Sequence, residues 1–456
     1  MDVSACGFFE ERSFLLKSWK TLSAEERRRF VEQCKSFQVD SAISAFENSI
    51  TNQGFVNLRP IPVDRHIVSY KLPAEELEKY WEKGLKAIAF GEVAALVLAG
   101  GQATRLGASQ PKGVLSLGID TECDTLFALQ ACRISRLQNL ALQKYPGSSP
   151  IIPWYVMTSA STYDDTWSYL EKNVSKFGIS LKNVHIFMQN QMPCFDKNGN
   201  FILADKAKLA MAPNGNGGLY AALAPYMESM KSNGIKYVHV YCVDNILCRV
   251  ADPYYIGFCI EKNADCAAKV VEKVDPDESV GVFCLEDKKV RLAEYSEIQK
   301  EYACRKTADG RLEFCAGNIA NHMFSINFLE KVCSSNFCLP YHRALKKIPY
   351  YDGEKIVKPS SPNGFKLELF LTDVLEYSNN FYLWEVSRHK EFSPLKNAEV
   401  AKKDCLSTCL QDLRAEQKRW LSAKGVEISE HSRIFISPLD SYMGEVQEYL
   451  WTAKTT

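Results

Sequence analysis

Residues 96–113, LVLAGGQATRLGASQPKG, combine the residue types that hold phosphate groups. The small residues of this stretch are Ala99, Gly100, Gly101 and Ala103. Because their side chains are minimal, backbone N–H groups can approach an anion closely, and Arg105 and Lys112 add fixed positive charge. The apolar run at residues 93–98 predicts a buried parallel strand ahead of the loop. We therefore expect nucleoside triphosphate chemistry here, although two glycines alone also suit an ordinary turn.

The glycine spacing separates this loop from the two commonest phosphate-binding loops. A P-loop requires Gly-Lys followed by Ser or Thr at the start of a helix, and dinucleotide-binding folds require G-x-G-x-x-G. Gly100, Gly101 and Gly107 match neither pattern. The sequence therefore predicts a third class of phosphate-binding loop.

A second apolar run, KYVHVYCV at residues 236–243, ends at Asp244 and Asn245. Ligands of open α/β sheets bind beyond the carboxyl ends of the strands, where this carboxylate is expected to lie. Asp244 could hold Mg²⁺ together with a triphosphate or bind a ribose hydroxyl, since Mg²⁺ at phosphate sites uses few protein carboxylates. A role as a helix N-cap explains Asp244 equally well.

Further residues with ligand-binding chemistry follow other strands and loops. Gln189 follows the apolar run VHIFM, and its carboxamide can both donate and accept, as the edge of a uracil requires. The glycine-rich residues 211–220 lead into a helix whose start could cradle a phosphate or a polar ring. Glu294 and Asn318 could bind a sugar, and Lys396 could clamp a second phosphate. Taken singly, these residues are also explained as surface positions and an ordinary turn.

The order of the predicted elements indicates an α/β fold. Apolar strands alternate with helices over residues 93–188, as in a doubly wound sheet. Adjacent alternating strands over residues 265–324 predict an antiparallel insertion that covers the ligand. We predict a mainly helical N-terminal domain at 1–90, a central domain with this insertion at 91–395, and a C-terminal domain at 396–456.

The composition argues against several classes of protein. At 456 residues, the chain has room for two or three domains and a large core. Lys plus Arg and Asp plus Glu both number 55, so no net charge attracts nucleic acid or an anionic membrane. The 16 cysteines show neither C-x-x-C pairs nor zinc-ligand spacing, which indicates reduced thiols. Because Glu10 and Glu11 interrupt any signal peptide and no run could span a membrane, we expect a soluble cytoplasmic protein.

These motifs resemble those of the eukaryotic UDP-N-acetylhexosamine pyrophosphorylases, also called UDP-N-acetylglucosamine pyrophosphorylases. The resemblance extends over residues 93–444 and is weakest in the first 90 residues. The shared signatures are LAGGQATRLG with PKG, MAPNGNGGLYAAL, HVYCVDNILCRVADP, IGFCIEKNADCAAKVVEKVDP, AEYSEI, AGNIANH and EFSPLKNA. The resemblance implies a nucleotidyltransferase with a Rossmann-like, GT-A-like central domain between smaller N- and C-terminal domains.

The resemblance also implies the reaction. An oxygen of N-acetylglucosamine 1-phosphate attacks the α-phosphorus of UTP in line, pyrophosphate leaves with Mg²⁺, and UDP-N-acetylglucosamine forms. N-acetylgalactosamine 1-phosphate stays open as a second sugar substrate. The step requires positioning and neutralised charge rather than a covalent intermediate. We expect the chain to act as a monomer or a homodimer.

By matching position, the resemblance implies a role for each candidate residue. The implied nucleotide contacts are Leu98, Ala99, Gly100, Gly101, Gln189, Gly215, Asn216 and Asp244, and Asp244 also serves the metal. The implied catalytic cations are Arg105, Lys112 and Lys396. The implied sugar pocket comprises Gly281, Glu294, Tyr295, Asn318, Lys366 and Phe370, with Asn318 beside the N-acetyl group.

The chain departs from the family pattern at four places. Ala103 replaces a glycine, and a positive φ at that position would cost about 1 kcal/mol. Gln191 replaces another glycine, Thr372 stands where the sugar pocket usually has an aromatic residue, and the carboxyl end at Thr456 comes early. These departures keep two alternatives open: a UDP-glucose or broad UDP-sugar pyrophosphorylase, and a nucleotide-sugar-binding homologue with little catalysis.

Overall fold

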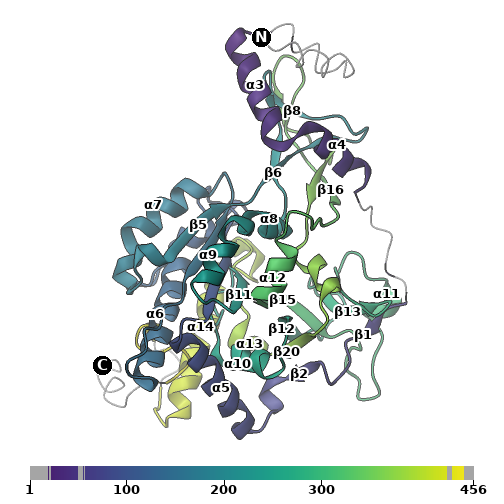
Figure 1. Cartoon of the computed structure of the whole chain (residues 1–456). Helices are drawn as coiled ribbons and strands as arrows, with labels where there is room; N and C mark the ends of the chain where they lie inside the picture. Colours follow the sequence, from purple (N-terminus) through teal and green to yellow (C-terminus); the bar gives the residue numbers. More distant parts are fainter. Residues whose placement is uncertain (1–18, 20–21, 50–54, 56, 429–433, 446–456) are drawn as a thin grey trace. The chain divides into compact units, whose positions relative to one another are not determined.

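The structure is a computed structural model that describes residues 19, 22–49, 55, 57–428 and 434–445 (Figure 1). Its contacts group the chain into two compact units, each formed by three stretches. Unit 1 comprises residues 1–53, 189–222 and 335–373, and unit 2 comprises residues 54–188, 223–334 and 374–456. Packing thus unites stretches that are distant in sequence, and a division into three consecutive domains at residues 90 and 395 stays a prediction.

Unit 2 is built on an 11-stranded sheet. The strands along its main path are β2 (His66–Val68), β20 (Phe381–Glu385), β12 (Cys266–Glu272), β15 (Ala316–Ser325), β11 (Tyr237–Cys242), β3 (Val93–Leu98), β4 (Trp154–Thr158) and β5 (Val184–Met188). All neighbouring strands on this path are parallel except β15, which runs antiparallel to both β12 and β11. The predicted doubly wound α/β sheet is confirmed.

The strand order reverses between β3 and β11. From β3 the chain proceeds outward through β4 to β5, and it later returns to place β11 on the other side of β3. The helices that follow these two strands, α6 (Leu126–Lys144) and α10 (Pro253–Glu261), both pack against α5 (Ala74–Ala89). This reversal is the position at which an open α/β sheet binds its ligand.

The predicted antiparallel strands form, but they do not make a separate insertion. β13 (Val282–Glu286) pairs with β14 (Lys289–Ala293), with β1 (Arg59–Pro60) and with β15, in each case antiparallel. Because β12 and β15 lie in the main path, the antiparallel region continues the parallel sheet. Alternating sequence patterns identify such strands but carry no information about which sheet they join.

Helices pack on both faces of the sheet in unit 2. Its α-helices are α5 (Ala74–Ala89), α6 (Leu126–Lys144), α7 (Tyr163–Asn173), α9 (Met227–Ser232), α10 (Pro253–Glu261), α11 (Lys300–Ala303), α12 (Ile326–Val332), α13 (Arg388–Glu391) and α14 (Leu406–Ala423). Val97 of β3 and Phe127 of α6 lie in one buried cluster. Tyr155 of β4 instead contacts Tyr226, with 5.9 Å between ring centroids. β3 and β4, covered on both faces, are buried at every position.

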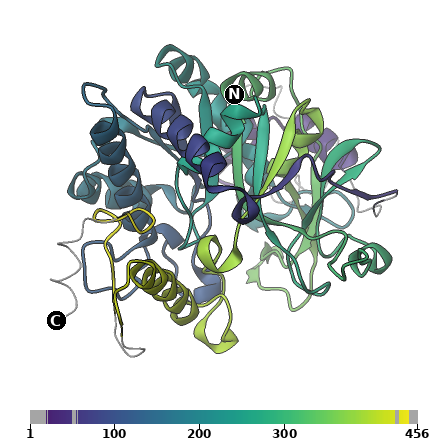
Figure 2. The same cartoon turned by 90° about the horizontal axis from the view of Figure 1, so that it is seen from below.

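The last described segment packs against α6. Arg136 Nε of α6 lies 3.0 Å from Glu445 Oε1, and the Tyr442 hydroxyl donates to the Val250 carbonyl at 3.0 Å. Figures 1 and 2 both show this segment, coloured yellow, beside α6. Residues 434–445 therefore add to the core of unit 2.

Unit 1 combines two helices with short antiparallel strands. Its elements are α3 (Ala24–Phe37), α4 (Val39–Glu47), β6 (Gln191–Pro193), β7 (Phe195–Asp196), β8 (Leu203–Asp205), β9 (Lys208–Leu209), β10 (Met211–Pro213), the 3₁₀ turn η6 (Asn216–Gly218), β16 (His342–Lys346), β17 (Tyr350–Tyr351), β18 (Ile356–Val357) and β19 (Gly364–Glu368). Phe195 stacks on Phe46 at 4.6 Å, and the Arg343 guanidinium covers the other side of the Phe46 ring at 4.2 Å. This aromatic cluster joins α4 to the strands.

The composition predicted reduced cysteines and no membrane-spanning segment. All cysteines within the described residues are free thiols. Among the described helices, none combines the length and the apolar character needed to cross a bilayer.

The backbones of α5 and α10 approach each other closely at two glycines. A Cβ on Gly84 would lie 2.0 Å from the Pro253 carbonyl oxygen, and a Cβ on Gly257 would lie 1.8 Å from the Tyr80 carbonyl oxygen. Neither helix backbone can yield without losing its packing on the sheet.

We predict that Gly84→Ala lowers the free energy of unfolding by about 1–3 kcal/mol, because the added methyl group overpacks this contact. Urea denaturation followed by circular dichroism measures the change. Lys86→Ala, at an exposed position of the same helix, is the control and should change stability by less than about 0.5 kcal/mol. Equal stability of the two variants would contradict the close packing.

Candidate active site

The loop after β3 and the residues after β11 begin side by side at the reversal of strand order. Leu98 pairs with Cys242 in the parallel register, and the Val243 N–H continues the ladder to the Leu98 carbonyl at 3.2 Å. Asp244 therefore follows β11 at the level where the glycine loop leaves β3. The structure therefore places the start of the glycine loop next to the residue that bears this carboxylate.

The glycine loop is fixed at its base and open at its start. The Ala99 N–H donates to the Met157 carbonyl at 2.8 Å, and the Ser159 hydroxyl donates to the Gly100 carbonyl at 2.8 Å. The amide groups of Gly100 and Gly101 have no acceptor among the described residues. They are therefore available to an anion. Sequence reasoning missed Ser159, although its position directly after β4 was the same signal that identified Gln189.

The loop returns on itself before Lys112. The Ala103 N–H donates to the Gln110 carbonyl at 2.9 Å, and the Lys112 N–H donates to the Gly101 carbonyl at 3.3 Å. Arg105 lies on the exposed 3₁₀ turn η2 (Thr104–Leu106) of this loop, and it forms no ion pair with any described residue. Its guanidinium is free to meet a ligand.

Ala103 carries no backbone strain. Its φ is −83°, and the left-handed conformation falls on Gly107, whose φ is 82°. The positive φ that would make alanine cost about 1 kcal/mol at this position is therefore absent. Gln191, the second glycine replacement, lies in β6 opposite Pro213 and is not among the residues with positive φ.

Lys112 lies between the two strand ends and the segment that carries Lys396. Its Nζ atom donates to the Leu395 carbonyl at 3.0 Å and lies 3.4 Å from Asp244 Oδ2. The two side chains are 15% and 17% exposed, so this ion pair is only partly hydrated. An ammonium group has three N–H donors, which leaves Lys112 one donor for a ligand.

Lys396 approaches the same place from the carboxyl-terminal part of unit 2. The Leu395 N–H donates to the Asp244 carbonyl at 2.8 Å. Burial and the Asp244 carboxylate raise the pKa of the Cys242 thiol to about 12, and the positive charges of Lys396 and Lys112 oppose this shift. Both ammonium groups therefore act on one thiol at the end of β11.

Three of the predicted sugar-pocket residues converge within unit 2. A Cβ on Gly281 would lie 3.1 Å from Glu294 Oε2, and the Asn318 N–H donates to the Gly281 carbonyl at 2.8 Å. The Asn318 side chain is held by the Ala320 N–H, which donates to its Oδ1 atom at 2.9 Å. Tyr295 is 52% exposed beside them. A side chain at position 281 would therefore press on the Glu294 carboxylate.

The charge of Lys396 also affects the pKa of Glu294. Burial and the neighbouring Glu297 raise the pKa of the Glu294 carboxyl above its ordinary value, and the positive charge of Lys396 opposes this. The implied sugar pocket and the implied phosphate clamp are therefore electrostatically connected within unit 2.

The second glycine loop lies in unit 1 and depends on its glycines. Gly215 has a φ of 88°, and a Cβ there would lie 2.5 Å from the Leu369 carbonyl oxygen. The Gly217 N–H donates to the same carbonyl at 2.9 Å. The side-chain oxygen of Asn216, Oδ1, accepts a hydrogen bond from the Leu371 N–H at 2.8 Å. Asn216 is nevertheless an exposed residue.

The remaining predicted residues also lie in unit 1. The Gln189 side chain is buried, and its Oε1 atom has no hydrogen-bond partner among the described residues, as expected of a group that meets a ligand. Phe370 stacks on His342 with 4.2 Å between ring centroids. Lys366 lies in β19 opposite Ala344.

A group of three residues whose spacing could suit a metal ion lies elsewhere in unit 2. Within the described residues, the grouping with metal-ligand spacing is His66, Cys315 and Glu385. Its carboxylate already contacts His66 Nε2 at 2.8 Å and lies 3.6 Å from an Arg311 nitrogen. Asp244 is not part of this grouping, so a cation at Asp244 would depend on ligand oxygens.

Comparison with known proteins identifies the family. The profile described as UTP–glucose-1-phosphate uridylyltransferase matches residues 44–433. The chain belongs to this uridylyltransferase family. A Caenorhabditis elegans protein named "Probable UDP-N-acetylglucosamine pyrophosphorylase" is 44% identical over 94% of this chain and 90% of its own length. The UDP-N-acetylglucosamine pyrophosphorylase of Saccharomyces cerevisiae is 37% identical over 95% of this chain and 94% of its own.

A solved structure agrees with these uridylyltransferase relatives. The uridine diphosphate N-acetylglucosamine pyrophosphorylase of Trypanosoma brucei, in complex with an inhibitor, is 29% identical and superimposes with a TM-score of 0.84. The match covers 97% of this chain and 93% of that one. Within the uridylyltransferase family, the chain is a member of the eukaryotic UDP-N-acetylhexosamine pyrophosphorylases, as the sequence motifs predicted.

We predict that Ala103→Gly destabilises this uridylyltransferase by about 1–2 kcal/mol. The native φ suits alanine, glycine adds conformational entropy to the unfolded chain, and a fully buried methyl group is lost. Chemical denaturation measures the difference from the wild-type chain. A variant more stable than the wild type would show that Ala103 is strained after all.

Proposed function

We propose that the chain transfers the uridylyl group of UTP to N-acetylglucosamine 1-phosphate and releases pyrophosphate. The observation that carries this proposal is the contact of Lys112 with Asp244 at the reversal of strand order, in a member of the uridylyltransferase family. The charge of Lys396 acts on Cys242 at the end of the same strand, β11. Two anionic reactants repel each other, and fixed cations lower that cost most where the surroundings are partly dehydrated.

The proposed roles divide by charge. Arg105, Lys112 and the free amides of Gly100 and Gly101 neutralise the triphosphate, while Lys396 holds the phosphate of the sugar whose oxygen attacks the α-phosphorus. Because this oxygen is already anionic, the step requires no general base, and catalysis consists of alignment and charge stabilisation. Leu98, Ala99, Gln189, Gly215 and Asn216 are proposed uridine contacts.

The proposed sugar contacts follow the chemistry of an N-acetylhexosamine. The Glu294 carboxyl and the amide of Asn318 offer hydrogen bonds to hydroxyl groups and to the N-acetyl group, respectively. Gly281 leaves space for the Glu294 carboxylate, and Tyr295, Lys366 and Phe370 complete the proposed set.

Asp244 is the proposed protein contact for Mg²⁺. A single carboxylate is a suitable donor set, because Mg²⁺ at nucleotide sites binds mainly phosphate oxygens and water. The Lys112 ammonium 3.4 Å away keeps this carboxylate oriented. When bound, Mg²⁺ would supply positive charge to the leaving pyrophosphate.

We predict that Lys112→Ala lowers kcat by on the order of 10²–10³, because charge stabilisation in the transition state is lost. Steady-state release of pyrophosphate measures the loss, and circular dichroism checks that the fold persists. Lys86→Ala, on the exposed face of α5, is the matched lysine control and should keep wild-type turnover. Full turnover by Lys112→Ala would remove this lysine from the mechanism.

The sugar preference tests the proposal against its alternatives. We expect the chain to turn over UDP-N-acetylglucosamine at least about tenfold faster than UDP-glucose in the reverse reaction with pyrophosphate, because unpaired polar groups in the pocket penalise a missing amide. A panel that includes UDP-N-acetylgalactosamine gives relative kcat/KM values. Preference for UDP-glucose would support the broader UDP-sugar enzyme, and tight binding without turnover would support a binding protein.

A further inference from the structure

The segment that carries Lys396 lies antiparallel to the residues that follow β11. The Leu395 N–H donates to the Asp244 carbonyl at 2.8 Å, and the Ile246 N–H donates to the Ser393 carbonyl at 3.1 Å. The residues between these pairs form a β-bridge. The separation of Lys112 from Lys396 therefore depends on this short, paired segment.

Asn245 extends the pairing to Glu391. Its side-chain nitrogen, Nδ2, donates to the Glu391 carbonyl at 2.7 Å, and its Oδ1 atom accepts a hydrogen bond from the Ser393 N–H at 3.0 Å. The side chain is 3% exposed, so water competes little for these bonds. The hydrogen bonds that fix this segment therefore begin at Glu391, the last residue of α13 and five residues before Lys396.

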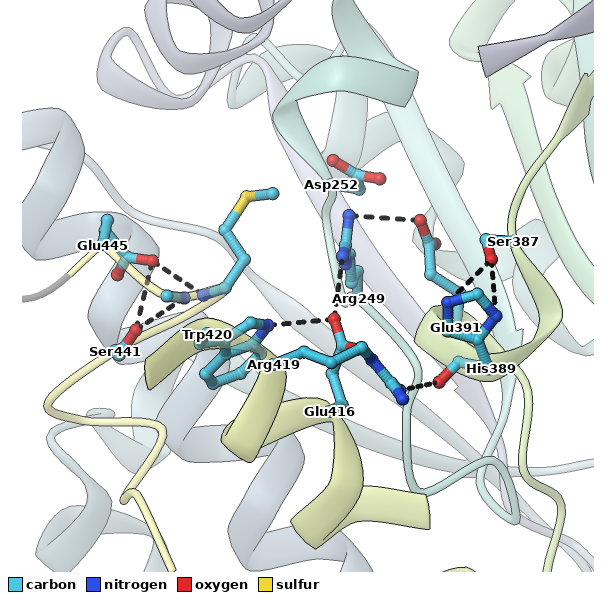
Figure 3. A network of polar contacts seen from close by, with 12 residues as sticks. Arg249, Asp252, Ser387, His389, Glu391, Glu416, Arg419, Trp420, Ser441 and Glu445 are labelled. Atoms are coloured by element: carbon cyan, nitrogen blue, oxygen red, sulfur yellow. Dashed lines mark hydrogen bonds and ion pairs between the residues drawn. The ribbon is translucent and has the colours of Figure 1, made fainter. Parts of the chain in front are cut away.

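The side chain of Glu391 is anchored by a buried lysine and a partly buried arginine. Its Oε2 atom accepts from Lys269 Nζ at 2.5 Å, and its Oε1 atom lies 3.2 Å from an Arg249 nitrogen (Figure 3). Because α13 comprises only four residues, it cannot hold its position without such tertiary contacts. Glu391 therefore fixes both the backbone and the direction of the chain that leads to Lys396.

Lys269 remains charged although it is fully buried. Burial by itself lowers the pKa of Lys269, but the carboxylates of Asp252 and Glu391 raise it above its ordinary value. Buried ion pairs contribute little net stability compared with apolar packing of equal volume, but they fix geometry strictly because a displaced partner leaves a bare charge. A geometric role explains why so much buried charge lies beneath this segment.

We infer that Glu391 is a positioning residue that sets Lys396 against Lys112. The inference rests on the proposed function, in which these two lysines hold the phosphates of both reactants. Glu391 touches no reactant, and it acts through the backbone of residues 391–396, which Asn245 and the ion pairs with Lys269 and Arg249 hold in place.

The first test is Glu391→Gln, with Glu416→Gln as the matched control. Glu416 is 3% exposed, Glu391 is 6% exposed, and both pair with Arg249 (Figure 3). Among the described residues, the other polar contacts of the Glu416 carboxylate are with Arg419 and Trp420 of its own helix α14, and none is with residues 391–396. Each substitution removes one buried carboxylate and leaves Arg249 the other. Melting temperatures are expected to fall in both variants.

Only Glu391→Gln is expected to lower kcat/KM for UDP-N-acetylglucosamine and pyrophosphate by about 10- to 100-fold, because misplacement near 1 Å has that effect. Glu416→Gln should stay within about twofold of the wild type, measured below both melting temperatures. Equal kinetics of the two variants would overturn the positioning role. Absence of turnover by the wild-type chain on any UDP-sugar would overturn the proposed function and this role together.

A double-mutant cycle with Lys396→Ala separates positioning from general loosening. If Glu391 acts through Lys396, Glu391→Gln should change kcat/KM less than about twofold once Lys396 is removed. An undiminished effect in the Lys396→Ala background would overturn the inference. Should Glu391→Gln not fold, Asn245→Ser, which loses the amide bond to the Glu391 carbonyl, is expected to show the same pattern. Failure of both variants to fold would assign these contacts to stability alone and also overturn it.

Discussion

The contact on which the site depends is the position of the Lys112 ammonium between the Asp244 carboxylate and the Leu395 carbonyl. It joins three stretches that are far apart in sequence: the loop after β3, the end of β11 and the segment before Lys396. Because the ammonium is partly buried, its charge is weakly screened, and the carboxylate and the carbonyl dipole both fix its direction. Every proposed phosphate contact in unit 2 is placed relative to this junction.

The sheet topology makes this junction possible. β3 and β11 are adjacent and parallel, and the chain leaves β3 toward β4 but reaches β11 from the other side. In the loop after β3, the amides of Gly100 and Gly101 have no acceptor among the described residues. The antiparallel strand β15 belongs to the same sheet and carries Asn318, so one sheet supports both the proposed phosphate contacts of unit 2 and this proposed sugar contact.

The structure accounts for some of the departures from the family pattern but not for all of them. Ala103 and Gln191 fit their backbone conformations, so neither weakens the assignment to the uridylyltransferase family. Thr372 is buried at 8% exposure, and nothing in the structure explains the loss of an aromatic residue there. The proposed sugar contacts Glu294 and Asn318 both lie next to Gly281 in unit 2.

Local patterns in the chain were enough to identify the α/β class, the strands β3, β4, β5 and β11, and the loops that bear Lys112 and Asp244, because periodicity and turn residues act over a few positions. The same patterns determine neither which sheet the antiparallel strands join nor the φ value at Ala103. Sheet membership and φ values depend on distant partners. Only the tertiary structure showed that Asn245 binds Glu391 in the segment before Lys396, and that Ser159 binds Gly100. Hydrogen bonds and ion pairs between residues that are distant in the chain produce no recognisable spacing in the sequence.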